Sequence, residues 1–264
     1  MTLVRATRSE FTKQRTTAMW WILLIILVGY IGFAVAGLAL VFGSQSDDSP
    51  SDFDVSGLIY GLAATAGYAI PLLLGTLLVT GEYRHQTLTP TFLATPRRGT
   101  VLWAKTLSGA VLGALYGVAG VIVSVGAGAG ILSIFGVDTK LGETDTWALI
   151  ARVILAYMLW ALIGVGLGSL ISNQIAAIVG VLVFTQFIEP LLLVAQATIE
   201  ALKDVLEFLP GAATNTLIGS SFFALATPAT GAVDPWWTGG LYLLGYAVVF
   251  LFLGYLIRWR RDVN

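Results

Sequence analysis

Cysteine is absent from this 264-residue chain, and histidine occurs only once, as His85. The absence of cysteine excludes disulfide bonds, thiolate catalysis and cysteine-ligated metal sites. A single histidine leaves almost no basis for zinc chemistry or a histidine general base, so we expect no metal site here. The phosphate-binding pattern Gly-x-x-x-x-Gly-Lys-[Ser/Thr] is also missing. We therefore expect that this chain is not an enzyme, holds no cofactor and binds no ATP itself.

Charge is scarce as well. Charged residues make up 11% of the chain, against about 25% in soluble domains, while 57% of the residues are hydrophobic and the mean hydropathy is +0.86. This composition predicts an integral membrane protein with membrane lipids around it and no nucleic-acid partner.

Long apolar runs predict six transmembrane helices in an all-α polytopic fold. The chain is expected to form one domain over residues 1–264, because no internal repeat or disordered tail is evident. The predicted spans cover about residues 18–42, 55–79, 101–135, 147–171, 175–198 and 236–257.

The distribution of charge predicts the orientation of these spans. Most basic residues fall before span one, between spans two and three, or after span six, whereas most acidic residues fall in the other connectors. Both termini are therefore expected in the cytoplasm, with the chain as a multi-pass protein of the plasma (inner) membrane. A cleavable signal peptide ending near Ala34-Val35-Ala36 is the alternative for the N-terminus.

Residues 3–17 predict a short amphipathic elbow helix ahead of span one. Leu3, Thr7 and Phe11 share one face, and Arg5, Ser9 and Lys13 lie roughly opposite. This pattern is typical of an interfacial helix with its basic face toward anionic headgroups, although a frayed basic N-terminus is the alternative.

The connector between spans two and three, residues 81–99, combines apolar and basic residues. Thr89-Pro90 is a plausible helix start, and Pro96 a plausible stop. A short helix here either docks in a groove of another protein or lies along the headgroups. Its apolar residues are Leu88, Phe92 and Leu93, and its basic neighbours are Arg84, Arg97 and Arg98.

Between spans five and six the sequence predicts two short extracellular re-entrant helices. The first covers residues 199–209, Pro210-Gly211 breaks it, and a second apolar piece covers residues 217–225.

Three intramembrane residues are candidates for a translocation pathway: Pro71, Gln186 and Glu189. A charge in the hydrocarbon is costly, so Glu189 suggests a function. The alternative is a carboxylate that reaches the outer interface, or that pairs with Gln186 or a loop group. The small-residue stripe Gly109, Gly113 and Gly117 favours close helix packing within the chain over a subunit interface.

The order of these parts resembles the membrane subunit of type 2 ATP-binding-cassette (ABC) exporters. The sharpest match is the connector, where the family shows a glutamate, a Gly-Thr-Leu step, a Pro-x-Arg element and a later lysine. These read here as Glu82, Thr87-Leu88, Pro96-Arg97-Arg98 and Lys105, with Gln86 in place of the usual glycine.

The resemblance implies that residues 84–93 form a coupling helix seated on a pair of separate cytoplasmic ABC ATPase subunits, which would hold ATP and Mg. It also implies a second permease subunit, identical or homologous, and a pathway bounded by spans two and five. A secondary transporter or a non-catalytic membrane scaffold is the alternative. The implied ATPase-coupling residues are Glu82, Arg84, Thr87, Leu88, Phe92, Pro96, Arg97 and Arg98.

Overall fold

The computed structural model describes residues 3–45, 54–95, 97–198, 208–219 and 235–259. Within these ranges the chain is helical, and six helices are long and apolar enough to cross a membrane. They cover Met19–Ser44, Val55–Arg84, Arg98–Ile134, Thr144–Leu170, Gln174–Leu192 and Trp236–Ile257. The predicted all-α fold with six membrane-competent helices is confirmed.

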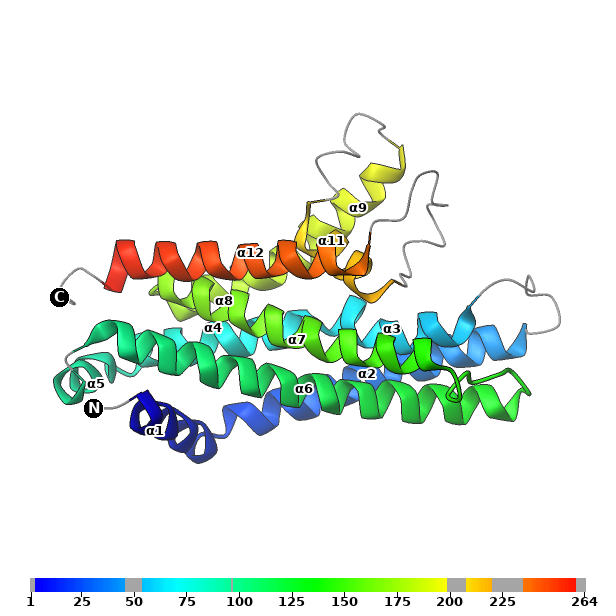
Figure 1. Ribbon diagram of the computed structural model, residues 1–264, viewed down its shortest axis with the longest axis horizontal. Coiled ribbons are helices and arrows are strands. Elements are labelled where there is room, and N and C mark those ends of the chain that lie inside the picture. The colour runs from blue at the N-terminus through cyan, green and yellow to red at the C-terminus, as the bar shows by residue number, and fades with distance from the viewer. Residues whose placement is uncertain (1–2, 46–53, 96, 199–207, 220–234, 260–264) are drawn as a thin grey trace.

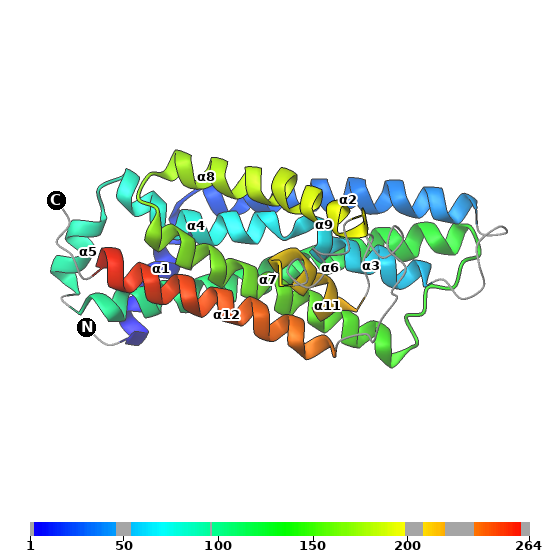
Figure 2. The same cartoon turned by 90° about the horizontal axis from the view of Figure 1, so that it is seen from above.

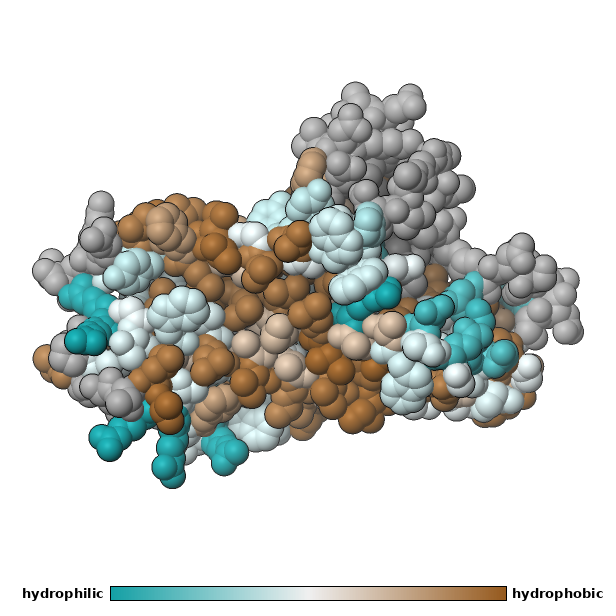
Figure 3. All heavy atoms as spheres, in the orientation of Figure 1, coloured by the Kyte–Doolittle hydropathy of each residue, from teal (hydrophilic) through white to brown (hydrophobic). Residues whose placement is uncertain are grey.

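Most of these helices lie along the long axis of the molecule (Figure 1). Helix α7 (Thr144–Leu170) is central and packs against α4 (Ala69–Arg84), α6 (Arg98–Ile134) and α12 (Trp236–Gly254). Helix α2 (Met19–Ser44) packs on α6 and on α3 (Val55–Gly67), and α8 (Gln174–Val183) runs beside α4 (Figure 2). Hydrophobic residues cover the middle of the face in Figure 3, and hydrophilic residues gather toward its ends.

Glycines allow the close approach of α6 to α7. A Cβ atom at Gly113 would lie 2.7 Å from the Ala161 Cβ, and one at Gly117 would lie 2.8 Å from the Ile154 Cα. Real side chains do not approach so closely, and small residues at such positions let two membrane helices pack backbone to backbone. The glycine stripe therefore packs within the chain, as the sequence analysis predicts.

The second span is interrupted one turn before its proline. Helix α3 ends at Gly67 and α4 begins at Ala69, with Tyr68 between them. Pro71 explains this position, because proline has no N–H to donate to the carbonyl four residues earlier, and its ring crowds that carbonyl. That carbonyl belongs to Gly67, so the break lies one turn before Pro71.

The fifth span is interrupted in the same way. A π-helical turn, Phe184–Ile188, separates α8 from α9 (Glu189–Thr198). Pro190 leaves the Gln186 carbonyl without its usual donor, and a widened turn is a common response to such a gap in the helical ladder.

Three smaller elements differ from their predicted bounds. The N-terminal helix α1 covers Leu3–Thr16, close to the prediction, but α5 covers only Leu88–Ala94, because Arg84 ends α4. Pro210 starts a helix, α11 (Pro210–Ile218), where a break was predicted, since proline is favourable in a first helical turn. The predicted helix at 199–209 lies almost wholly outside the described residues. The same is true of residues 220–225 of the second predicted re-entrant helix.

Candidate functional site

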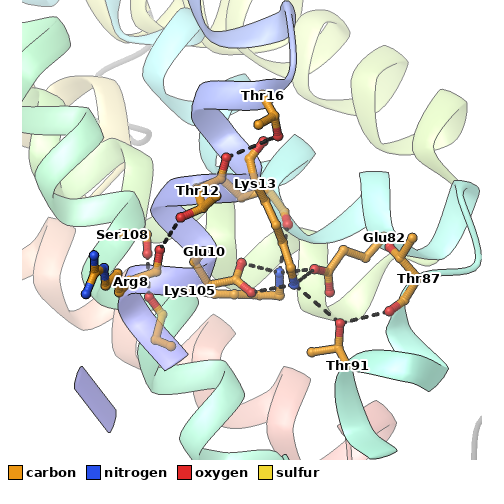
Figure 4. Close-up of polar contacts among 12 residues, drawn as sticks. Arg8, Glu10, Thr12, Lys13, Thr16, Glu82, Thr87, Thr91, Lys105 and Ser108 are labelled. Carbon is orange, nitrogen blue, oxygen red and sulfur yellow. Dashed lines mark hydrogen bonds and ion pairs between the residues drawn. The ribbon is translucent and has the colours of Figure 1, made fainter. Parts of the chain in front are cut away.

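Two acidic and two basic side chains form a buried cluster where α1, α4, α5 and α6 meet (Figure 4). Lys13 Nζ lies 2.7 Å from Glu10 Oε1 and 2.6 Å from Glu82 Oε1, and it donates to Thr91 Oγ1 at 3.3 Å. Thr91 belongs to α5, so one ammonium group touches three elements. We call Glu10, Lys13, Glu82 and Lys105 the ion cluster.

Lys105 completes the ion cluster from α6. Its Nζ lies 2.8 Å from Glu10 Oε2 and 3.0 Å from Glu82 Oε1, and it also donates to the Leu78 carbonyl at 3.2 Å. Lys105 is 1% exposed and Glu10 is 3% exposed. Buried charges of this kind are stable only when they are paired and hydrogen-bonded. The geometry therefore holds α1 and α6 rigidly against the end of α4.

The electrostatics of the ion cluster favour the charged state of its α1 residues. Burial by itself raises the pKa of the Glu10 carboxyl, but the Lys105 and Lys13 ammonium groups outweigh burial, so this pKa lies below its usual value. Burial lowers the pKa of Lys13, but Glu10 and Glu82 outweigh it, so that pKa is raised. Both groups stay ionised at neutral pH.

Two buried oxygens beside the ion cluster have no hydrogen-bond partner within the described part of the chain. They are Glu82 Oε2 and Gln14 Oε1. Both residues line a cavity of about 540 Å³ between α1, the start of α2 and the end of α4. Buried acceptors of this kind are normally satisfied, so water or a donor group fits this cavity.

The junction between α4 and α5 is a tight left-handed turn at Gln86. The Gln86 N–H donates to the Tyr83 carbonyl, and the Thr87 N–H donates to the Glu82 carbonyl at 3.0 Å, which is the Schellman pattern at a helix end. Gln86 has a φ of 54°, in the region that favours glycine. The backbone thus keeps a glycine-like conformation at the position where the sequence departs from the resembling family.

Helix α5 presents a different apolar residue to solvent than the sequence analysis proposed. Leu88 is 2% exposed, because it turns into the chain, and Phe92 packs edge-to-face on Trp259 with ring centroids 5.4 Å apart. Leu93 is instead 79% exposed. Leu88 and Phe92 therefore support α5 from inside, and the apolar surface available to a partner is Leu93.

The basic residues around α5 separate into two sets. Arg84 and Arg98 bind within the chain: Arg84 Nη1 lies 3.5 Å from Gln174 Oε1, and Arg98 donates to the Trp259 carbonyl and lies over the Phe92 ring. Arg97 and Thr87 are exposed beside α5. Pro96 lies outside the described residues.

The buried residues of helix α1 share only Thr7 with the apolar face that the amphipathic pattern predicts. Its buried residues are Ala6, Thr7, Glu10 and Gln14. Lys13 was predicted to face the headgroups, but it turns toward the protein, because Glu10 and Glu82 compensate its charge. The predicted basic face is wrong at this residue.

A further buried carboxylate, Glu189, lies about halfway along the bundle, beside Tyr68 in the middle of span two. Glu189 is fully buried, accepts a hydrogen bond from the Tyr68 hydroxyl at 2.6 Å, and accepts another from the Gly211 N–H at the start of α11. Gln186 is not among its hydrogen-bond partners in the described part of the chain, so of the two pairing alternatives the one with a group of the loop between spans five and six is observed. A Cβ at Gly211 would lie 2.8 Å from the carboxyl carbon, so this contact requires glycine.

The contacts of Glu189 join the two helix interruptions to the start of α11. These interruptions are the one at Tyr68 in span two and the π-helical turn in span five. Tyr68 also stacks on Trp160 at 4.4 Å, and Trp160 donates to Thr214 of α11 at 2.9 Å. A cavity of about 190 Å³ lies beside this group, with Gln186, Thr65 and Asn215 among its lining residues. Pro71 is buried and does not line it.

Sequence reasoning missed Glu10, Tyr68 and Gly211. Glu10 carried a usable signal, because it is the single acid in an otherwise basic segment of 17 residues. Tyr68 and Gly211 carried none, because their role depends on contacts with Glu189, which lies 121 residues from Tyr68 and 22 residues from Gly211 in the sequence.

Together, the six apolar helices and the charged cluster at one end define a multi-pass integral membrane protein. The family model described as "ABC-2 family transporter protein" matches residues 6–263, nearly the whole chain. The chain belongs to this family and is a permease component of an ABC transporter, a type of protein that generally works with an ATP-binding subunit. No match was found among curated proteins.

Proposed function

We propose that this chain is an exporter permease that works as a dimer and is driven by a separate pair of cytoplasmic ATPase subunits. The observation that carries the proposal is the ion cluster, which joins α1, α4 and α6 through ion pairs and contacts α5 through the hydrogen bond from Lys13 to Thr91. A push on α5 reaches three further helices through these contacts, because separating the buried ion pairs is costly. ATP and Mg bind to the partner, and this chain performs no catalysis.

The ATPase docks on the exposed side of α5, with Leu93 as the apolar contact and Arg97 beside it. In the complex purified with its ATPase, Leu93→Asp should abolish association. Ile134→Asp is the matched control, because Ile134 is 80% exposed at the opposite end of α6. Retained ATPase binding by the Leu93 variant would contradict this docking surface.

In this arrangement α1 is an interfacial elbow helix, α11 is part of a re-entrant segment, and both termini are cytoplasmic. The basic residues at the α5 end support this orientation. Because the chain lacks cysteine, single cysteines at Leu93 and Asp145 report it directly. An impermeant thiol reagent should label Asp145→Cys from outside and Leu93→Cys only from inside, and the reverse pattern would overturn the orientation.

The pathway runs between spans two and five, and Glu189 closes it about halfway along span two. The support is geometric: this carboxylate ties α11 to the two interrupted spans, and interruptions are the points at which helices bend. Glu189→Ala should make a cysteine at Asn215 accessible from outside without ATP. Glu143→Ala is the control, because Glu143 is exposed at the start of α7. Equal accessibility in both variants would contradict a closing role for Glu189.

A further inference from the structure

A groove of about 560 Å³ lies between α1 and α6, on the side of α1 away from the ion cluster. Its apolar lining comes from Leu3, Val4 and Phe11 of α1 and from Leu107 of α6. Val4 is 77% exposed and Leu107 is 47% exposed. Water is a poor solvent for such surface, whereas the border of a membrane accommodates it.

Two arginines flank this groove, Arg8 and Arg15. They are seven residues apart, which places them on one face of α1 at a spacing of about 10 Å. Both are exposed, and within the described part of the chain neither side chain makes an ion pair or a hydrogen bond. Figure 4 shows Arg8 pointing away from Glu10 and Lys13.

The charge of the groove is of one sign. Apart from the arginines its lining consists of apolar residues and two threonines, with no carboxylate. The acid nearest in sequence is Glu10, and it is committed to Lys13 and Lys105 on the buried face. Two uncompensated guanidinium groups next to exposed apolar side chains match a molecule with an anionic head and an apolar tail.

We propose that this groove is a binding site for one anionic phospholipid. Its phosphate lies between Arg8 and Arg15, and an acyl chain runs over Phe11 and Leu107. The bound lipid covers the face of α1 that carries Arg8 and Arg15, while the ion cluster holds the face of α1 that is buried against the protein. The position of α1, and hence of the ion cluster, then depends on an anionic lipid in the surrounding leaflet.

Native mass spectrometry of the purified full chain tests the site directly. The protein is mixed in a neutral detergent with equal amounts of phosphatidylglycerol and phosphatidylcholine that carry the same acyl chains. We expect one retained phosphatidylglycerol per chain. Arg8→Gln and Arg15→Gln should each reduce its retention about fivefold, the effect of one basic residue near an anionic lipid. These arginines are exposed and unpaired, so the variants should fold normally.

Arg5→Gln is the matched control, since it removes the same charge from α1 at an exposed residue outside the groove. It should change retention less than twofold. An equal loss in the Arg5 and Arg8 variants would mean that general attraction to a basic helix explains the lipid, and would overturn the site. Equal retention of the two lipids would also overturn it.

Leu107→Gln separates a lipid site from a site for free phosphate. It alters only the apolar wall, so it should weaken phosphatidylglycerol retention if an acyl chain lies there. Unchanged phosphatidylglycerol retention in this variant would contradict the proposed position of the acyl chain over Leu107.

Discussion

Lys105 is the residue on which the ion cluster depends most. Replacing Lys105 with Met leaves two buried carboxylates with one lysine, and breaking a buried pair costs about 3–5 kcal/mol. Lys140→Met is the control, because the Lys140–Asp54 pair at 3.1 Å is largely exposed and pairs of that kind contribute about 0–1 kcal/mol. The melting temperatures of the two variants in detergent measure these losses of stability. Equal decreases in the two variants would argue against a structural role for the ion cluster.

The pKa shifts in α1 predict how stability responds to pH. The pKa of Glu10 is lowered by folding, so its contribution is complete above about pH 4.5 and is lost as pH falls through the folded value. The pKa of Lys13 is raised, so its contribution is complete below about pH 10.4 and is lost above it. The difference in melting temperature between the wild-type protein and Glu10→Gln should therefore be constant from pH 6 to 9 and shrink below pH 4. A difference that grows in acid would contradict this assignment.

Gln86 carries a small local strain. A residue with a side chain in the left-handed region costs about 1 kcal/mol relative to glycine, and the exposed Gln86 side chain makes no hydrogen bond to the described residues that would offset this cost. Gln86→Gly should raise the free energy of unfolding by up to about 1 kcal/mol, whereas Gln86→Val should lower it. If the glycine variant were less stable than wild type, the turn would not be strained.

At the scale of elements, glycine placement decides how closely α6 and α7 pack. Gly113→Ala should destabilise the fold by about 1–3 kcal/mol, because its new methyl group meets Ala161 and the backbone of α7. Gly126→Ala on the same helix has open space around it and should be neutral, or stabilising by up to about 1 kcal/mol through helix propensity. Melting temperatures of the two variants test this contrast, and similar losses would argue against close packing at Gly113.

The elements themselves were largely predictable, and their interruptions were not. Hydropathy predicts the six spans because the bilayer demands long apolar helices. Pro71 and Pro190 lie close to the interruptions of spans two and five, but the form of each interruption depends on the carbonyl four residues earlier and on the packing around it. The break at Tyr68 and the π-helical turn before Glu189 follow from that local balance.

The candidate site was predictable only in part, for a reason visible in two residues. Glu82 and Lys105 stood out by family resemblance, whereas Glu10, which pairs with Lys105, lies 95 residues away from it in the sequence. Leu88 and Leu93 have similar apolar side chains, and only the orientation of α5 shows which one faces outward. Contacts between distant segments are not encoded in local pattern.

At the scale of the whole molecule, the structure has buried polar contacts at two levels of an apolar bundle. The ion cluster lies at the end with α5, and Glu189 lies about halfway along span two, where it ties α11 to spans two and five. In the proposed transporter, movement of α5 is followed by release of α11. The helices between them are packed too closely to bend independently.

The most direct test is the accessibility of a cysteine at Asn215 in the complete complex, reconstituted in proteoliposomes with its ATPase. Asn215 lines the cavity of about 190 Å³ beside Glu189. ATP should increase labelling of this cysteine from outside by an impermeant thiol reagent, and Lys105→Met should remove the increase while the ATPase stays bound. Labelling that is unchanged by ATP, in a complex that hydrolyses it, would contradict the coupling of α5 to the cavity beside Glu189.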